Sequence, residues 1–517
     1  MFDNNGDALR HRITAACGAG FLLFGYDQGV FGGILSNKSF IETFNNPNST
    51  IQGQIVASYD IGCIMGTIVS MFLGDKLGRK RCIFCGCTIL IIGGILQAAS
   101  YSIALMIFGR VVAGIGNGMN TIAIPVWQSE TAKPGNRGKL IVLQMVTNIF
   151  GIVITNWMNF GFTYVPDNSV SWRFPLAFQC VFAIVTIIMT SIAPESPRWL
   201  IMSKRETEAQ NVIARFQSKP ENHASVIEEM QYLAASVNHE AELQNSVSFK
   251  EIFRGRDAGF STSGRSKCYR LLSSNVCSNV FRQFKKLLLT ICSVLVRSFG
   301  MSQRLALILS AVDSMSLMFW GGIAALLIDR IGRRRLMLMG VACSGVCFAL
   351  VAIGLRYSGP DKTNKSMSIL AVVFIFLYYV FYGLSLLSIP FMYPAEVNSQ
   401  RMRNMGTSIA TAVNWTCVYI VVVVTPTAID SIGWKYYLIY AIFNFAFVPI
   451  IWHWYVETAN LSLEQVDRLF EIKHAGGKKM NWKEATRLAK METPTNIELK
   501  EENGQNGMAS HHESPNK

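Results

Sequence analysis

Charged side chains occur inside stretches of the sequence that are otherwise apolar. Asp27 follows Phe24, Gly25 and Tyr26 in one such stretch, and Arg110 lies in another. A charge within a bilayer is costly, so each is a candidate functional group with a partner to find. A carboxylate beside a guanidinium stays ionised, whereas burial without that partner favours the protonated form. Separation of Asp27 from Arg110 would therefore drive proton uptake, which is the chemistry that this pair could carry.

The spacing of these two residues within their stretches predicts a shared depth. Asp27 lies eight residues before the end of its stretch at Leu35, and Arg110 lies seven residues after the start of its own at Ile103. At a helical rise of about 1.5 Å per residue, they lie roughly 12 and 10 Å from the same face. A static ion pair is the alternative to a proton switch. Asp60 falls at the same depth, but a polar residue near a helix end is its simpler explanation.

A charged motif occurs once in each half of the sequence. Gly-Asp-Lys-Leu-Gly-Arg-Lys-Arg at 74–81 matches Ile-Asp-Arg-Ile-Gly-Arg-Arg-Arg at 328–335. Acidic residues at helix ends can pair with Arg clusters of neighbouring helices in one conformation and separate in another. Membrane topology alone could explain the Arg clusters, but it does not require the acidic residues. The expected members of a cytoplasmic gate are Asp75, Arg79, Glu130, Arg137, Glu195, Asp329, Arg333, Glu396, Arg403 and Glu457.

Two amide side chains could bind a polar substrate. Gln144 and Asn148 are four residues apart, so they face one way on a helix. Sugars and polyols need such groups, because each hydroxyl must regain the hydrogen bonds that it loses from water. The alternative is that both amides only help helices to pack.

Membrane helices are the elements that must position these groups. The chain has 517 residues, of which 50% are hydrophobic and 15% charged, with a mean hydropathy of +0.30. Soluble globular chains carry about 25% charged residues, so a soluble enzyme is excluded. The net charge of +14 does not indicate nucleic acid, because the basic residues lie between apolar stretches and in one long connector. The 12 Cys lack disulfide or metal-ligand spacing, and no Gly-x-x-x-x-Gly-Lys-Ser/Thr phosphate loop is present.

Apolar stretches of about twenty residues are long enough to cross a bilayer as helices. Lys and Arg concentrate in the connectors after the second, fourth, eighth and tenth stretches of a twelve-span arrangement, which places those connectors on the cytoplasmic side. Both termini are then cytoplasmic if the number of spans is even. A twelfth span is expected near residue 287. The eleven clear stretches lie near 13–35, 53–73, 82–100, 103–127, 139–163, 173–193, 305–328, 336–356, 367–392, 403–425 and 434–456.

The pattern divides the chain into regions, and one segment is anomalous. Within 255–297 basic residues are frequent, and the mostly apolar run at 287–296 is too short to span. We interpret this segment as a mispredicted exon or a frameshift, and the alternative is a transporter that is inactive because it lacks helix 7. The regions are an N-terminal six-helix bundle at 1–198, a cytoplasmic helical connector at 199–286, a C-terminal six-helix bundle at 287–456 and a cytoplasmic tail at 457–517.

Several short motifs lie along the chain's apolar stretches and connectors: Phe24-Gly25-Tyr26-Asp27, Asp75 to Arg81, Arg137-Gly138, Pro194-Glu195-Ser196-Pro197-Arg198, Asp329 to Arg335, Tyr393-Pro394-Ala395-Glu396 and Asn414-Trp415. These motifs resemble those of sugar porters of the major facilitator superfamily. Within that family, 124–130 and 383–390 are similar to segments of fungal porters, the hexose transporters and the yeast glycerol/proton symporter among them. The resemblance implies an all-α integral membrane protein with the twelve-helix major facilitator fold, in which two six-helix bundles alternate access to a central site and a cytoplasmic helical domain joins them.

The resemblance also implies roles for particular residues. In the resembling symporters, the Asp of the Gly-Tyr-Asp segment and the Arg of the fourth helix take part in proton coupling, and Asp27 and Arg110 occupy those positions. An Asn-Trp pair and an aromatic side chain contribute to the sugar site of the family. With the two amides above, the expected substrate-binding residues are Phe24, Gln144, Asn148, Phe391, Asn414 and Trp415.

The chain departs from the family pattern at several places. The principal Gln of the family's fifth helix aligns best with Met145, Trp is commoner at the position of Phe391, and related fungal porters tend to have Asn at that of Asp313. The Gln-Gln-x-x-Gly-x-Asn segment of the seventh helix is absent. Glucose, xylose, glycerol and a disaccharide therefore stay open as substrates.

The sequence predicts a secondary active transporter for proton-coupled uptake of a sugar (monosaccharide) or polyol across a fungal plasma membrane. It predicts no enzyme activity, no metal and no cofactor, with the proton as the coupling ion. The expected partners are the small-molecule substrate and the lipid bilayer, without nucleic acid or an obligate protein partner. A facilitative hexose uniporter, a transporter-like nutrient sensor and an inactive chain are the alternatives.

Overall fold

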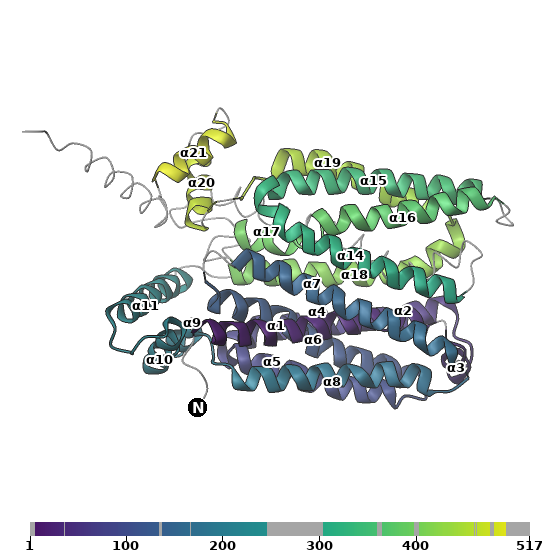
Figure 1. Cartoon of the computed structure of the whole chain (residues 1–517), viewed down its shortest axis with the longest axis horizontal. Coiled ribbons are helices and arrows are strands. Elements are labelled where there is room, and N and C mark those ends of the chain that lie inside the picture. Colours follow the sequence, from purple (N-terminus) through teal and green to yellow (C-terminus); the bar gives the residue numbers. More distant parts are fainter. Residues whose placement is uncertain are drawn as a thin grey trace, which may run out of the picture.

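The computed structural model is helical throughout the part of the chain that it describes. Long helices run side by side along one direction, and short helices gather at one end of the molecule (Figure 1). The expected twelfth span near 287 and the anomalous segment at 255–297 lie outside the described residues. These residues are 6–35, 37–133, 137–165, 167–245, 303–358, 364–397, 403–459, 461, 463–475 and 480–492.

The N-terminal half lies in the lower part of Figure 1, in purple to teal. Side chains of Asn48 and Ser102 accept hydrogen bonds from the backbone N–H groups of Ile51 and Leu105, and these caps begin the second and fourth long helices. Its helices are α1 (Gly6–Gly29), α2 (Phe31–Ile34), α3 (Lys38–Thr43), α4 (Ser49–Leu77), α5 (Arg79–Ala98), α6 (Ile103–Thr131), α7 (Arg137–Gly161), the 3₁₀ turn η2 (Phe162–Tyr164) and α8 (Val170–Ile192).

The C-terminal half lies above it in Figure 1, in green to yellow. Its described helices are α14 (Gln303–Ile331), α15 (Arg333–Tyr357), α16 (Lys365–Ser385), α17 (Ile389–Val397), α18 (Arg403–Ile432) and α19 (Lys435–Trp454). The stretch at 367–392, expected as one span, is not one continuous helix, because it breaks between α16 and α17. Pro390 is the physical reason, since it has no backbone N–H to continue the α-helical ladder and is tolerated in the first turn of a new helix.

Five helices lie at the end of the molecule where α1 begins (Figure 1). Three follow the N-terminal half: α9 (Pro197–Met202), α10 (Glu206–Gln217) and α11 (Ala224–Asn245). They lie in or next to the first part of the predicted connector at 199–286, whose bounds and cytoplasmic location stay predictions. Two more, α20 (Leu463–Ala475) and α21 (Trp482–Glu492), form a hairpin with its own small apolar core in the C-terminal tail.

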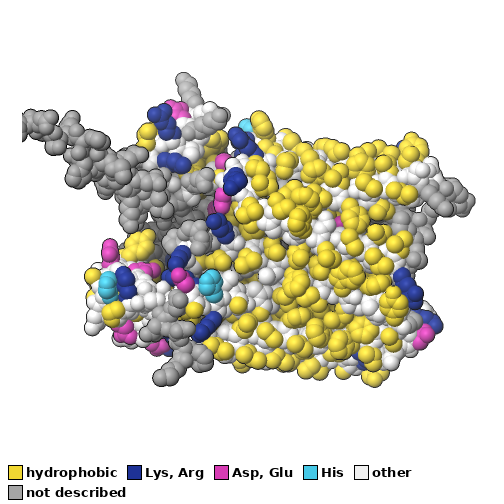
Figure 2. Space-filling view, in the orientation of Figure 1, with side chains coloured by type: hydrophobic (Ala, Val, Ile, Leu, Met, Phe, Trp, Pro, Cys, Tyr) yellow, Lys and Arg dark blue, Asp and Glu magenta, His cyan; other side chains and the backbone are white. Residues whose placement is uncertain are grey.

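An apolar surface covers the long helices. Figure 2 shows hydrophobic side chains over the face of the bundle, with charged side chains gathered at its two ends. Among the described residues, nine helices are long and apolar enough to cross a membrane. The long helices α1 and α18 occupy two further spans predicted from the sequence, and α18 contains a shorter apolar helix at Thr411–Thr425. Such a distribution is that of a protein surrounded by lipid.

The two halves meet where α4 packs along α18 and α7 packs along α14. Within the N-terminal half, glycines let helix backbones approach closely, as is common in membrane bundles. A Cβ added to Gly114 of α6 would lie 2.2 Å from the carbonyl oxygen of Tyr59 in α4, and one added to Gly25 would lie 1.7 Å from that of Asn148. These close approaches fix the side chains of α1, α4, α6 and α7 that form the candidate site.

Candidate functional site

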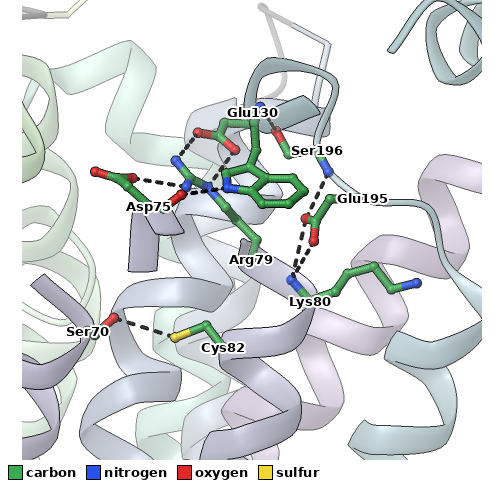
Figure 3. A network of polar contacts seen from close by, with 9 residues as sticks. Ser70, Asp75, Arg79, Lys80, Cys82, Glu130, Glu195 and Ser196 are labelled. Atoms are coloured by element: carbon green, nitrogen blue, oxygen red, sulfur yellow. Dashed lines mark hydrogen bonds and ion pairs between the residues drawn. The ribbon is translucent and has the colours of Figure 1, made fainter. Parts of the chain in front are cut away.

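Arg79 joins three helices of the N-terminal half at one end of the bundle (Figure 3). Its guanidinium donates two hydrogen bonds to the Glu130 carboxylate, from Nε at 3.1 Å and from Nη2 at 2.9 Å. Nη1 donates a third to Asp75 Oδ1 at 3.0 Å. The bidentate geometry is the strong form of a guanidinium–carboxylate pair. Because Asp75, Arg79 and Glu130 belong to α4, α5 and α6, this one buried side chain holds three helix ends together.

Arg333 makes the equivalent contacts in the C-terminal half. Its Nη1 donates to Asp329 Oδ1 at 2.8 Å, and its Nη2 donates to Glu396 Oε1 at 3.2 Å. The other Glu396 oxygen accepts a hydrogen bond from the Thr458 hydroxyl at 2.6 Å. Each network thus joins helices of its own half, one in the N-terminal half and one in the C-terminal half. The matched sequence motifs therefore correspond to matched three-dimensional networks.

A second carboxylate in each half binds the beginning of the helix that carries the Arg. Glu195 accepts hydrogen bonds from the backbone N–H groups of Lys80 and Ser196, at 3.1 and 3.0 Å. Glu457 likewise accepts from the N–H groups of Arg333 and Arg334, at 2.8 and 3.1 Å. A carboxylate at a helix N-terminus is favoured by its unpaired N–H groups. Burial raises the pKa of the Glu195 carboxyl, and the two N–H groups oppose that shift.

Glycine is required before each of these helices. Gly78 has φ +88° and ψ 167°, and Gly332 has φ +96° and ψ 150°, a backbone region that is essentially restricted to glycine. An added Cβ would lie 2.9 Å from Glu195 Oε2 at the first position and 2.5 Å from Glu457 Oε2 at the second. The glycine of the repeated motif thus allows both the turn and the approach of the carboxylate.

Replacement of Gly332 by Ala is expected to destabilise the protein. Strain in this backbone region costs about 1–3 kcal/mol, and the new Cβ would also displace the Glu457 carboxylate from its N–H donors. We expect a lower melting temperature for the detergent-purified variant. Gly322→Ala is the matched control, because no described atom lies within 4 Å of its added Cβ and Ala favours a helix. Equal melting temperatures for the two variants would contradict this interpretation.

Asp27 and Arg110 meet in the interior of the N-terminal half. Arg110 Nη1 donates to Asp27 Oδ1 at 3.4 Å, and Nη2 donates to the backbone carbonyl of Val56 at 3.3 Å. Both side chains of the pair are at most 3% exposed. The guanidinium also lies between two aromatic rings, with its carbon 4.4 Å from the ring centroids of Phe31 and of Tyr59. The depth estimated from the sequence therefore corresponds to a buried ion pair, and its role in coupling stays a prediction.

The expected substrate residues lie on both halves. Phe24 of α1 contacts Trp415 of α18, with ring centroids 5.7 Å apart, so these two side chains meet across the boundary between the halves. Gln144 is 3% exposed, and neither of its amide atoms has a hydrogen-bond partner among the described residues. Asn148 donates to the backbone carbonyl of Phe21 at 3.4 Å, which is a helix-packing contact.

Other residues singled out in the sequence are described by their burial or by their backbone. Asn414 and Asp313 are buried, and Met145 is buried beside Gln144. Asp60 is also buried, in α4. The backbones of Phe391, Arg137 and Arg403 are described but their side chains are not, so the roles predicted for them stay predictions.

Sequence reasoning missed several residues that complete these networks. The Trp199 indole donates to the carbonyl of Asp75 at 2.7 Å, and Thr458 binds Glu396 as described above. Trp199 directly follows the Pro194 to Arg198 motif and Thr458 directly follows Glu457, so their positions beside expected gate residues could have indicated them. Tyr59 gave no such signal, because an aromatic residue in an apolar helix is ordinarily a packing residue.

Comparison with known proteins identifies the family. The model of the family described as "Sugar (and other) transporter" matches residues 12–470. The chain belongs to this family. The sugar porter is 40% identical over 475 residues to "MFS-type transporter oryC" of Aspergillus oryzae, across 91% of this chain and 87% of that one. It is 34% identical over 507 residues to "Sugar transporter STL1" of Saccharomyces cerevisiae, across 94% and 85% of the two chains.

Solved structures share the fold of this sugar porter. The proton:xylose symporter XylE of E. coli, bound to 6-bromo-6-deoxy-D-glucose, superimposes with a TM-score of 0.75 over 90% of this chain and 100% of that one. Sequence identity is 20%, so this similarity concerns the fold alone. The predictions of a major facilitator sugar porter, of its twelve-helix fold and of a multi-pass membrane protein that is not an enzyme are confirmed.

Proposed function

We propose that this sugar porter takes up a sugar or polyol together with protons, by alternating access of its two halves. The observation that carries the proposal is the buried Asp27–Arg110 pair, which joins α1 to α6 by a single 3.4 Å hydrogen bond between the two side chains. A carboxylate in this environment is stabilised as the anion chiefly by its guanidinium partner. A modest change in their separation would therefore change the protonation of Asp27.

The mechanism links that protonation to substrate binding. A proton from outside binds Asp27 and weakens its hold on Arg110, and substrate then binds between the halves near Phe24 and Trp415. Rocking of the halves opens the site to the cytoplasm, substrate leaves, and renewed pairing with Arg110 returns the proton from Asp27 to the cytoplasmic water. The net result is one proton and one substrate carried inward in each cycle.

The charged networks at the cytoplasmic ends act as the gate in this proposal. Arg79 and Arg333 hold three helix ends each while the site is closed on that side, and release them when it opens. Interfaces with two discrete arrangements are the usual basis of such transitions. The end of the molecule with α9, α10 and α11 is then cytoplasmic, as are both termini, and the plasma membrane is the expected location.

The substrate class follows from the polar groups near the centre. Gln144 presents an amide donor and an amide acceptor that are buried without a described partner, which suits a ligand rich in hydroxyl groups. Phe24 and Trp415 offer apolar ring surface to the carbon face of such a ligand. STL1 is named as a sugar transporter and XylE as a xylose symporter, and both names support a sugar here.

Gln144→Leu is expected to raise the KM for substrate about tenfold, with little change in the maximal rate. Loss of a hydrogen bond to a buried partner costs about 1–3 kcal/mol, and about 1.4 kcal/mol corresponds to a factor of ten. Thr147→Val is the control on the same helix, because the Thr147 hydroxyl donates to carbonyls of its own helix. Concentration curves of labelled uptake measure both. An unchanged KM for Gln144→Leu would remove this residue from the site.

The proposed function is tested by uptake of labelled glucose and glycerol into transporter-deficient yeast cells that express the chain, with external pH recorded. We expect one of the two compounds to accumulate and the medium to become more alkaline as it enters. Uptake without alkalinisation would identify a uniporter instead. Absence of uptake for both compounds, despite chain at the cell surface, would reject the proposed function for the chain as it stands.

A further inference from the structure

An aromatic contact connects the candidate substrate site to the ion pair. The Trp415 ring in α18 lies 6.4 Å from that of Tyr59 in α4, at an interplanar angle of 82°. The Tyr59 ring also contacts Arg110, whose guanidinium carbon lies 4.4 Å from the ring centroid. Trp415, Tyr59, Arg110 and Asp27 therefore form one continuous series of contacts. The series crosses from the C-terminal half into the N-terminal half.

Two aromatic rings contact Arg110 in addition to its ion pair. Phe31 and Tyr59 contact the guanidinium at the same distance, and the hydrogen bond from Arg110 to Asp27 has the long separation of 3.4 Å. A desolvated guanidinium is attracted to the faces of aromatic rings. Displacement of either ring would therefore let Arg110 move relative to Asp27.

The two rings differ in what can displace them. Phe31 packs against Phe40 in an apolar cluster at the outer end of the N-terminal half. Tyr59 lies on α4, the helix that packs along α18 of the opposite half, and its ring contacts Trp415. Movement of one half against the other thus reaches Tyr59 directly. The main-chain position of Tyr59 is fixed by the close approach of Gly114, so its ring is the part that can respond.

We propose that Tyr59 is a positioning residue that couples movement of Trp415 to the separation of Arg110 and Asp27. This inference rests on the proposed proton-coupled function and names the side chain through which the two binding events communicate. When substrate and rocking displace Trp415, the Tyr59 ring moves with it, Arg110 changes its distance from Asp27, and the carboxylate changes its protonation. The titratable and charged groups around the pair are Tyr26 of α1, Tyr59, Asp60 and Cys63 of α4, and Cys180 of α8, besides Asp27 and Arg110 themselves.

The test removes the aromatic ring of Tyr59 but keeps a large apolar side chain in its place. Tyr59→Leu and Tyr59→Met remove the aromatic face, while Tyr59→Phe keeps it and serves as the matched control. Purified variants in proteoliposomes are assayed with labelled glucose and labelled glycerol in two ways: exchange at equal pH, and accumulation under a gradient of one pH unit. A symport of one proton per substrate supports up to about tenfold accumulation under that gradient.

We expect Tyr59→Leu and Tyr59→Met to keep exchange and lose accumulation, and Tyr59→Phe to keep both. Accumulation in either variant that lacks the ring, or loss of exchange together with accumulation in both of them, would assign Tyr59 to packing alone and overturn the inference. The wild type and Asp27→Asn separate this outcome from the proposed function. If the wild type itself fails to accumulate either compound, the proposed function fails, whatever the Tyr59 variants do.

Discussion

Asp27→Asn is expected to abolish substrate accumulation while leaving exchange intact. Asn has nearly the same shape as Asp and can still accept a hydrogen bond from Arg110, so the packing around the pair is preserved. It cannot take up or release a proton in the relevant range, so the pH gradient no longer drives transport. Under a gradient of one pH unit, accumulation should fall from as much as about tenfold to none. Labelled uptake at steady state measures this ratio.

Asp60→Asn is the control for the Asp27 prediction. Asp60 is also a buried carboxylate of the N-terminal half and falls at a similar depth in the sequence-based estimate. Its simpler interpretation is structural, so we expect the variant to accumulate substrate as the wild type does. If Asp60→Asn lost accumulation and Asp27→Asn kept it, the coupling carboxylate would have been assigned to the wrong residue.

Arg79→Ala is expected to reduce transport to a small fraction of the wild-type rate. Removal of one partner from a buried ion pair costs about 3–5 kcal/mol, because the remaining charge is left uncompensated. Here that charge is Glu130, whose two oxygens both bind Arg79. A cost of this size would shift the equilibrium between two conformations by a factor of at least about a hundred. Initial rates of labelled exchange, corrected for chain at the cell surface, measure the loss.

Two comparisons make the Arg79 prediction specific to the network. Arg81→Ala removes an exposed Arg of the same cluster, so it should transport normally if Arg79 acts through its contacts and not through topology. The double variant Arg79→Ala with Glu130→Gln should be less impaired than Arg79→Ala alone, since it leaves no buried charge unpaired. Equal impairment in Arg79→Ala and Arg81→Ala would mean that the cluster serves orientation in the membrane only.

The charged residues of the candidate site could be predicted from the sequence. An Asp or Arg in a membrane span stands out from its neighbours, so Asp27, Arg110 and both gate motifs could be found without coordinates. The repeat was informative for the same reason: Arg79 and Arg333 occupy equivalent places in their halves, and the structure gives them equivalent partners. The apolar stretches gave the membrane helices because about twenty such residues are needed to cross a bilayer.

Other features could not be predicted because they depend on how helices pack. The break before α17 arises from one proline in an otherwise apolar stretch, and prolines within α6, α8 and α19 do not cause such a break. Tyr59 has the same residue type as many packing residues, and only its place between Trp415 and Arg110 distinguishes it. The identity of the substrate depends on the exact placement of Gln144 and its neighbours, which a helical pattern does not specify.

The most direct test of the central claim is proton movement driven by substrate alone. Purified chain is reconstituted into liposomes that contain a pH-sensitive dye, with equal pH on both sides, and labelled glucose or glycerol is added outside. The account predicts that the lumen becomes acidic as substrate enters, and that Asp27→Asn admits substrate without this change. Entry of substrate into wild-type liposomes at constant internal pH would contradict proton coupling and identify a uniporter.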